Sequence, residues 1–270
     1  MKKLYANKGL LYFVILATVI VASLFGIRML LDAAYVPVIM MYHSVEGENP
    51  GIEGYYDKLN VLPSVFRDQM RFLSEHNYKV IPLESFINKI KKGERIPAKT
   101  VAITFDDGLR NNFLVAYPVL KEYNFPATFF IAPGLIGRKN FITWDDLRVT
   151  REDVISIGSH TVSHMWLPDK ERSEIKNELV ESRIMLEKNT GRKVLTLSYP
   201  LGGFSEEVKE IAREVGYIGA CATNPGRGHR NDDPYALKRI RISMSSKNVF
   251  VFLVETSGYY TFIKEIRDSE

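Results

Sequence analysis

The stretch "TVAITFDDG", residues 100–108, runs from six apolar or β-branched residues into two aspartates and a glycine. Such a run is typical of a buried β-strand, in which neighbouring side chains point to opposite faces of the sheet. Asp106 and Asp107 would then repel each other, and one of them would face the core. Gly108 lets the chain bend sharply, so that both carboxylates can turn toward one space. The pair therefore predicts a functional site at the carboxyl end of this strand.

Strands and helices alternate along most of the remaining chain. Amphipathic patterns predict a helix that begins at Ser64 as its N-cap, one that ends near Gly191 and one that ends at Gly216. The alternation predicts an α/β fold, either a (β/α) barrel or a doubly wound sheet. Besides residues 100–105, the runs that resemble strands are 36–41, 78–81, 127–132, 154–158, 194–199, 217–222 and 239–243.

The N-terminal region carries an uncharged run of 19 residues, 9–27, which is long enough to cross a bilayer as a helix. Lys2, Lys3 and Lys8 precede the run, so the positive-inside rule places the N-terminus in the cytoplasm. We therefore expect residues 1–34 to be a cytoplasmic tail and single membrane anchor of a bacterial cell membrane, and 35–270 to be one extracellular domain. A signal peptide cleaved near residues 21–23 is the alternative, and it would make the protein secreted.

Charge excludes one class of partner. The chain has 36 basic and 32 acidic residues, a formal net charge of +4. Without the first 34 residues, which hold four basic and one acidic residue, 32 basic and 31 acidic residues remain. The exported part thus lacks the basic surface that nucleic-acid binding needs.

Histidines also follow predicted strands. His43 follows the strand at 36–41, and His160 and His164 in "GSHTVSH" follow the strand at 154–158. Active sites of α/β folds lie at the carboxyl ends of strands, where these residues would meet the Asp106–Asp107 pair. Two neutral imidazoles and one carboxylate with an open position are typical of a catalytic zinc-type site. One aspartate would then bind the metal, and the other would be free to act as a base.

These motifs resemble the polysaccharide deacetylase family, which has the NodB-homology domain and forms carbohydrate esterase family 4. The segment "VAITFDDGLRNNFLVAYPVLKEYNFPATFFI" (101–131) is similar to its first motif with the following helix and strand, and "GSHTVSH" to its second motif. The likeness extends from about residue 36 to residue 245. It implies a distorted (β/α) barrel of seven to eight strands.

The resemblance also implies roles for the four residues. Asp107, His160 and His164 would hold a divalent metal, most often zinc, although this ligand set also accepts cobalt, nickel or iron. Asp106 would be the general base that activates a metal-bound water for attack on an N-acetyl carbonyl, which the metal polarises.

The third motif departs from the family pattern Arg-x-Pro-Tyr. Ser198, Tyr199, Pro200 and Leu201 stand in these places. The backbone N–H of Leu201 can still contact the oxyanion, and we expect Tyr199 and Pro200 to contact substrate. The arginine that would orient Asp106 is replaced by Ser198, so another group must take this role.

The final family motif, Leu-x-His, which supplies the general acid, is missing. His43 in "MMYHSV" is the better replacement, and His229 in a polar loop is the other histidine that could serve. The opening around His43 resembles the subgroup that acts on poly-β-1,6-N-acetylglucosamine in biofilm matrix. Arg239 or Arg241 on the last strand could orient Asp106.

The leading hypothesis is thus a metal-dependent hydrolase, expected to be a monomer, that removes N-acetyl groups from an N-acetylglucosamine polymer of cell wall or biofilm. Trp144 could stack on a sugar ring, or it could belong to the core. An O-acetyl esterase of the xylan type is a second hypothesis. A carbohydrate-binding protein without turnover is a third, motivated by the two departures from the family motifs.

Overall fold

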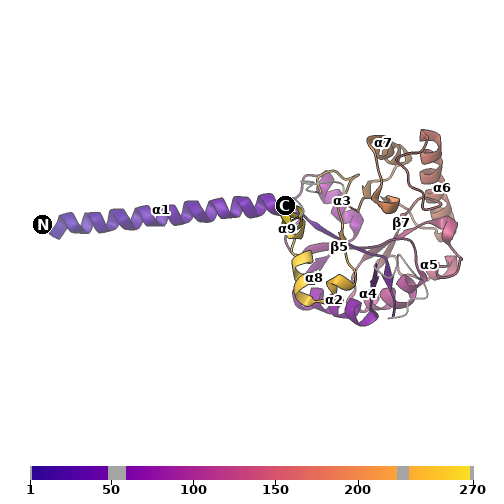
Figure 1. Cartoon of the computed structure of the whole chain (residues 1–270), viewed down its shortest axis with the longest axis horizontal. Coiled ribbons are helices and arrows are strands. Elements are labelled where there is room, and N and C mark those ends of the chain that lie inside the picture. Colours follow the sequence, from indigo (N-terminus) through magenta and orange to yellow (C-terminus); the bar gives the residue numbers. More distant parts are fainter. Residues whose placement is uncertain (1, 48–58, 224–230, 268–270) are drawn as a thin grey trace. The chain divides into compact units, whose positions relative to one another are not determined.

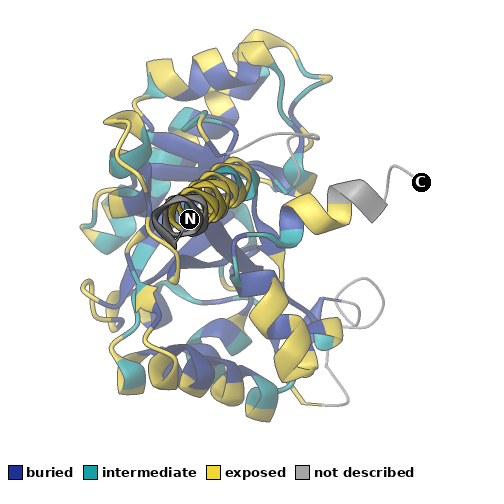
Figure 2. Cartoon of the chain, turned by 90° about the vertical axis from the view of Figure 1, so that its left-hand side faces the viewer, coloured by how far each residue is buried: buried dark blue, intermediate teal, exposed yellow. Residues whose placement is uncertain are grey.

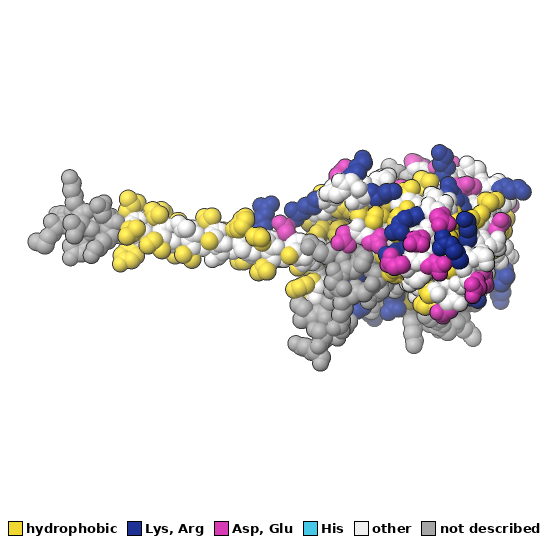
Figure 3. Space-filling view, turned by 90° about the horizontal axis from the view of Figure 1, so that it is seen from above, with side chains coloured by type: hydrophobic (Ala, Val, Ile, Leu, Met, Phe, Trp, Pro, Cys, Tyr) yellow, Lys and Arg dark blue, Asp and Glu magenta, His cyan; other side chains and the backbone are white. Residues whose placement is uncertain are grey.

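The computed structural model describes residues 2–47, 59–223 and 231–267, and it divides into two compact units, Met1–Tyr35 and Val36–Glu270. The first unit consists of helix α1 (Lys2–Ala34). From Leu10 to Ala34 this helix is long and apolar enough to cross a membrane and none of it is buried, although a signal sequence would pass the same test. Figure 3 shows its hydrophobic side chains along this stretch.

The second unit is built on one parallel sheet, in which β5 and β7 lie among the surrounding helices (Figure 1). Its strand order is β10-β1-β5-β6-β7-β8-β9, and β4 also pairs with β5. Every strand expected from the sequence is present. Their bounds are β1 (Val38–Tyr42), β4 (Lys79–Val80), β5 (Thr100–Phe105), β6 (Ala127–Ile131), β7 (Ile155–Ser159), β8 (Thr196–Ser198), β9 (Gly219–Cys221) and β10 (Ile240–Arg241). A separate pair of short strands joins β2 (Ser44–Val45) to β3 (Asn60–Val61).

The sheet curls until its last strand meets the chain that leads into β10. The N–H of Ala222 donates to the carbonyl of Leu237, and the N–H of Leu237 donates to the carbonyl of Ala220. Leu237 is followed within three residues by β10, which pairs with β1 at the other edge of the sheet. The expected distorted barrel is confirmed, and residues 237–239 form the seam between its two edges.

Helices cover the outside of the sheet and bury one face each, as the alternation of dark blue and yellow along them shows in Figure 2. Two predicted helix ends are confirmed, because Gly191 and Gly216 both cap helices with a left-handed backbone. The predicted N-cap at Ser64 was wrong: the cap is Leu62. Pro63 lacks an N–H and fits the first helical position, which moves the cap upstream.

The helices of this unit have the following bounds: α2 (Pro63–Glu75), α3 (Leu83–Lys91), α4 (Tyr117–Tyr123), α5 (Trp144–Arg148), α6 (Arg172–Thr190), α7 (Glu206–Val215), α8 (Val249–Thr256) and α9 (Tyr260–Arg267).

The phase of β5 decides which aspartate enters the barrel. Val101, Ile103 and Phe105 pack in the large core cluster with the helices, whereas Ala102 packs with the inner cluster that includes Leu237. Side chains alternate along a strand, so Thr104 and then Asp106 continue the inner face. The carboxylate of Asp106 therefore points into the barrel, and Asp107 comes just after the strand has ended.

One buried carboxyl group outside the barrel interior makes stability depend on pH. Glu255 of α8 is 3% exposed, and its Oε2 has no hydrogen-bond partner. Burial raises the pKa of Glu255 to about 7. A carboxyl whose pKa is raised on folding stabilises the fold fully below its unfolded pKa, and this stabilisation is lost as the pH rises through 7.

We expect the Glu255→Gln variant to lack this pH dependence. The free energy of unfolding of the full chain in detergent micelles should fall between pH 5 and pH 8 by up to roughly 3 kcal/mol more in the wild type than in the variant. Denaturant titrations at the two pH values measure the difference. Glu181→Gln, at an exposed position of α6, is the control and should follow the wild type. Parallel pH dependences of Glu255→Gln and wild type would contradict the assignment.

Candidate active site

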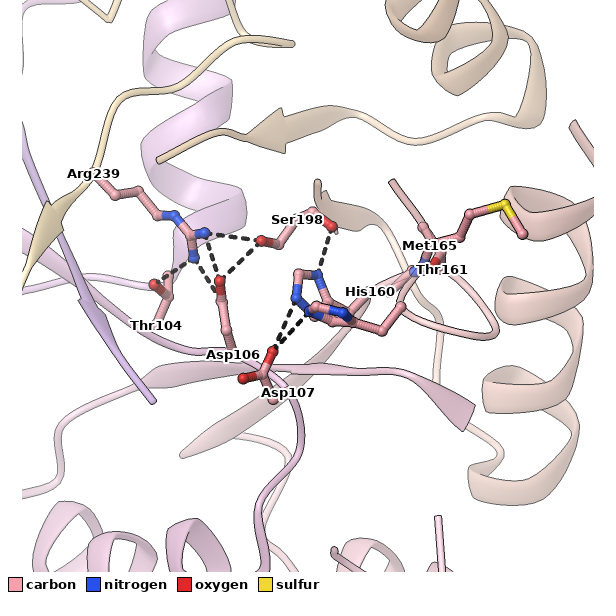
Figure 4. Close-up of polar contacts among 10 residues, drawn as sticks. Thr104, Asp106, Asp107, His160, Thr161, Met165, Ser198 and Arg239 are labelled. Atoms are coloured by element: carbon pink, nitrogen blue, oxygen red, sulfur yellow. Dashed lines mark hydrogen bonds and ion pairs between the residues drawn. The ribbon is translucent and has the colours of Figure 1, made fainter. Parts of the chain in front are cut away.

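A bidentate ion pair holds Asp106 at the centre of the barrel mouth (Figure 4). Two nitrogens of Arg239 each donate to one carboxylate oxygen of Asp106 at 2.6 Å, and Ser198 Oγ donates to Oδ2 at 3.2 Å. Arg239 also donates to Thr104 Oγ1 and, through Nε, to the carbonyl of Ala222. The guanidinium thus reaches from the seam across the interior. Of the two arginines considered from the sequence, Arg239 is the one that binds Asp106.

This pairing keeps Asp106 ionised although its side chain is buried. Burial acts to raise the pKa of Asp106, but the charges of Arg239 and His160 and the hydrogen bonds from Arg239 outweigh it, and the pKa is lowered. The fixed guanidinium fork also leaves the carboxylate a single orientation. Asp106 is therefore a deprotonated, oriented proton acceptor.

Three side chains beside Asp106 form a second cluster. Asp107 Oδ1 lies 3.2 Å from Nε2 of His160 and 3.2 Å from Nε2 of His164. One ligand atom from each of the three residues lies within 4.8 Å of the others. Ligands about 2.0–2.1 Å from a tetrahedral ion are themselves roughly 3.3 Å apart, so the spacing of the donors suits a divalent metal.

The protonation pattern of this cluster also fits a cation. His160 Nδ1 lies 2.7 Å from the carbonyl oxygen of Ser198, which can only accept, so Nδ1 carries the proton and Nε2 can face a metal. Burial acts to raise the pKa of Asp107, yet the close contacts with the imidazoles of His160 and His164 hold it well below its usual range. Burial acts to lower the pKa of His160, but Asp107 and Asp106 raise it. The cluster thus favours a positive charge between its three side chains.

Left-handed backbone conformations bring these side chains together. Asp107, Thr161 and His164 have φ values of 71°, 60° and 62°. Such values are uncommon outside glycine, and for a β-branched residue such as Thr161 they are strained. The backbone of Asp107 itself therefore makes the turn that we expected at Gly108, whose φ is 73°. Because the chain turns at Asp107, two adjacent carboxylates can serve one site.

His43 joins the same site from the end of β1. It lines a cavity of about 310 Å³ together with Asp106, Asp107, His160 and His164, and Leu201, Thr223, Arg241 and Met41 complete the lining. Its Nδ1 is buried and has no hydrogen-bond partner among the described residues. Burial lowers the pKa of His43. The sequence-predicted residues of the two motifs and His43 are thus brought together.

Three residues of the segment after β8 were expected to belong to the site, and the structure places one of them in the cavity and two outside it. Leu201 lines the cavity with a φ of 56°, and its backbone N–H donates no hydrogen bond within the described structure. Tyr199 was wrongly expected to contact substrate. It is 1% exposed, because it faces the outer core, stacks on Phe204 and donates to the carbonyl of Tyr235. Pro200 is likewise buried in the turn.

Two further predicted residues lie away from the cavity or outside the described chain. Trp144, at the start of α5, is half-buried, packs against the core and is absent from the lining of the catalytic cavity. Its packing fits the core alternative, and stacking on a sugar outside this cavity stays a prediction. His229, the other histidine considered as a general acid, lies outside the described residues. The sequence allowed either Arg239 or Arg241 to orient Asp106 and could not choose between them. The only feature in the sequence that pointed to Arg239 was its position on the predicted last strand.

Comparisons with known proteins agree with this geometry. The family model described as polysaccharide deacetylase matches residues 93–220, which include Asp106, Asp107, His160 and His164. YxkH of Bacillus subtilis (strain 168), which bears the name of a polysaccharide deacetylase, is 31% identical over 205 residues, covering 76% of this chain and 71% of YxkH. The poly-β-1,6-N-acetyl-D-glucosamine N-deacetylase of Staphylococcus aureus (strain MRSA252) is 27% identical over 198 residues, covering 68% of each protein.

Solved structures show the same fold. The Streptococcus pyogenes deacetylase PplD, in complex with acetate, has a TM-score of 0.69 and 26% identity, covering 77% of this chain and 92% of that one. IcaB from Ammonifex degensii has a TM-score of 0.70 and 21% identity, covering 83% and 97% of the two chains. The second likeness is one of fold alone.

The three-residue cluster predicts a measurable metal affinity. His164→Ala should weaken binding of Zn²⁺ to the full chain at least tenfold, since even groups that only orient ligands contribute 10–100-fold. Calorimetric titration of the metal-free protein with Zn²⁺ measures the change. His76→Ala removes a histidine that stacks on Phe72 at the end of α2 and is the control. Equal affinities of the His164 and His76 variants would show that the cluster is not the metal site.

Proposed function

The chain belongs to the polysaccharide deacetylase family, and we propose that it removes N-acetyl groups from an extracellular polysaccharide that contains N-acetylglucosamine. The observation that carries this proposal is the joining, in one cavity, of an arginine-held carboxylate with an Asp–His–His cluster that suits a metal. The name of the Staphylococcus aureus relative supports an N-acetylglucosamine polymer as substrate. The apolar helix at the N-terminus supports export of the domain that follows.

Asp106 is the proposed general base. It is ionised and held by Arg239, so its free lone pairs can accept a proton from a water that attacks the acetyl carbonyl. Arg239 and Ser198 fix the carboxylate in one orientation from the side of the barrel interior. Arg239 is thus a positioning residue, and it replaces the arginine that the third sequence motif lacks.

Asp107, His160 and His164 would hold the metal, with zinc as the leading candidate and cobalt, nickel or iron as alternatives. When bound, the ion supplies Lewis-acid chemistry, since it polarises the acetyl carbonyl and makes a nearby water more acidic. The hydrogen bond from His160 Nδ1 to the carbonyl of Ser198 fixes the imidazole orientation.

Two groups complete the proposed reaction on other sides of the cavity. The unpaired N–H of Leu201 can donate to the oxygen that becomes negative during attack, as an oxyanion-hole donor does. The proton that Asp106 takes from the attacking water would pass to His43, which lines the same cavity, and from His43 to the departing amine nitrogen, so that the protons balance. Because burial lowers the pKa of His43, its imidazole is neutral beforehand and gives the proton up readily.

The role of Asp106 is tested with Asp106→Asn. The amide keeps the shape and one acceptor oxygen but cannot take up a proton, so acetate release from β-1,6-linked N-acetylglucosamine oligomers should fall about 10²–10⁴-fold. Zn²⁺ binding should persist, because the three ligands are unchanged. Asp145→Asn, at an exposed carboxylate of α5, is the matched control. Full activity of Asp106→Asn would refute the assignment, and release of acetate only from O-acetylated xylan would favour the esterase reading.

The positioning role of Arg239 is tested with Arg239→Lys. Lysine keeps the charge but lacks the planar fork, so the carboxylate loses its fixed orientation. We expect kcat for acetate release to fall roughly 10–100-fold, by analogy with groups that orient catalytic ligands, while KM and Zn²⁺ affinity change little. A change in KM alone, with kcat preserved, would assign Arg239 to substrate binding or to structure instead.

A further inference from the structure

Two of the arginines whose side chains the structure describes have no side-chain partner. Each arginine whose side chain the structure describes makes an ion pair, a hydrogen bond or a ring contact, apart from Arg138 and Arg241. Both are exposed, and each lines a cavity. A guanidinium carries five donors in a fork that matches carboxylate and phosphate groups. An unpaired guanidinium in a ligand cavity is therefore available to an anion from outside the protein.

Arg241 is part of the lining of the catalytic cavity. It lies opposite Met41 in the pairing of β10 with β1, two residues beyond Arg239, which precedes that strand. The two carboxylates of the cavity are already engaged, Asp106 by Arg239 and Asp107 by two histidines. Arg241 thus adds a positive charge that no acidic side chain of the cavity balances.

Arg138 lies at a second cavity of about 570 Å³, which also has Arg110, Lys139, Phe141 and Glu46 among its lining residues. Arg110 pairs with Asp146, whereas Lys139, like Arg138, is exposed and has no acidic partner among the described residues. Unpaired cations therefore outnumber unpaired anions here as well.

Two short links connect the linings of the two cavities. Asp107 lines the first and Arg110 the second, and three residues of extended chain span at most about 11 Å. On another side, Asn111 of the second cavity donates to Ser44 Oγ at 2.9 Å, and Ser44 follows His43 of the first. A polymer whose acetamide enters the catalytic cavity could therefore extend its neighbouring sugars over the second one.

The excess of positive charge at the two cavities is not a property of the domain as a whole. Beyond the first 34 residues the chain holds 32 basic and 31 acidic residues, so a cavity chosen at random would be close to neutral. Granting the deacetylation proposed above, we propose that the substrate is an acidic glycan: Arg241 binds a carboxylate or phosphate on or next to the sugar whose acetamide is cleaved. Arg138 and Lys139 bind acidic groups on units further along the polymer. This arrangement also disfavours glycans that already carry glucosamine ammonium groups.

The test compares oligomers that differ only in charge. The full chain in detergent micelles is given a tetrasaccharide of alternating N-acetylglucosamine and N-acetylmuramic acid, with its lactyl carboxylates free or converted to carboxamides. A second arm uses an N-acetylglucosamine oligomer with and without a 6-phosphate. Because charge-assisted hydrogen bonds to a guanidinium are strong, we expect kcat/KM for acetate release to be about tenfold or more higher for one acidic member than for its neutral match. The arm that shows this ratio identifies the acidic group.

Variants test whether Arg241, Arg138 and Lys139 cause the preference for acidic glycans. In Arg241→Gln the ratio of acidic to neutral kcat/KM should fall to about one, whereas Arg71→Gln, at an exposed position of α2, should keep the wild-type ratio. The Arg138→Gln, Lys139→Gln double variant should lower the ratio for hexasaccharides more than for disaccharides. A ratio near one in the wild type, with acetate released, overturns the inference and leaves the proposed deacetylation intact.

Binding separates this inference from the proposed function. If no oligomer releases acetate, the proposed deacetylation fails, and calorimetry measures the binding of the same pairs of oligomers. Tighter binding of the acidic member that is lost in Arg241→Gln then supports acidic-glycan recognition. Equal affinity for both members in the wild type overturns the inference.

Discussion

The buried pair between Arg239 and Asp106 connects the fold to the site. Arg239 is anchored in the seam through its bond to the carbonyl of Ala222, and its guanidinium also binds Thr104 and Ser198, so three other segments of the chain meet on this one cation. Neither charge could remain in the interior alone, because an unpaired buried ion costs several kcal/mol. The sheet therefore has to curl until the residue that precedes β10 reaches the end of β5, because only then is the proposed base ionised and oriented.

The alternation of side chains along the strands and the left-handed backbone positions decide where the other site residues lie around this pair. The inner face of β5 delivers Asp106 to Arg239, and the left-handed turn at Asp107 delivers the next carboxylate to two histidines. His164 and Leu201 reach the same cavity from left-handed positions at the ends of two other strands. Strained conformations persist only where the surrounding structure enforces them, and here they coincide with the residues that would hold a metal and an oxyanion.

The sequence predicted features that depend on neighbouring residues, but it did not predict which distant residues pair in the fold. Apolar runs located every strand of the large sheet but missed the short strands β2 and β3, and the glycines at 191 and 216 located two helix ends. Both signals depend on neighbouring residues. The convergence of the aspartate pair with the histidines followed from the rule that parallel strands end at one edge. The partner of Asp106 lies 133 residues away, so motif spacing could name two candidate arginines but not choose between them. Tyr199 was misjudged because the inward phase of Ser198 sends the next side chain to the outer core.

The depth at which the two halves of the site are buried has an evolutionary consequence. A lineage released from selection for turnover could lose His164, whose side chain is 27% exposed, at little cost to folding. Replacement of Asp106 by an apolar residue, which has no acceptor oxygen, would instead leave the fully enclosed guanidinium of Arg239 without this partner, so that descendants with this change would tend to be eliminated as unstable proteins. Inactive descendants should therefore keep a hydrogen-bond acceptor for Arg239 at position 106 and differ more freely from active ones at the histidines.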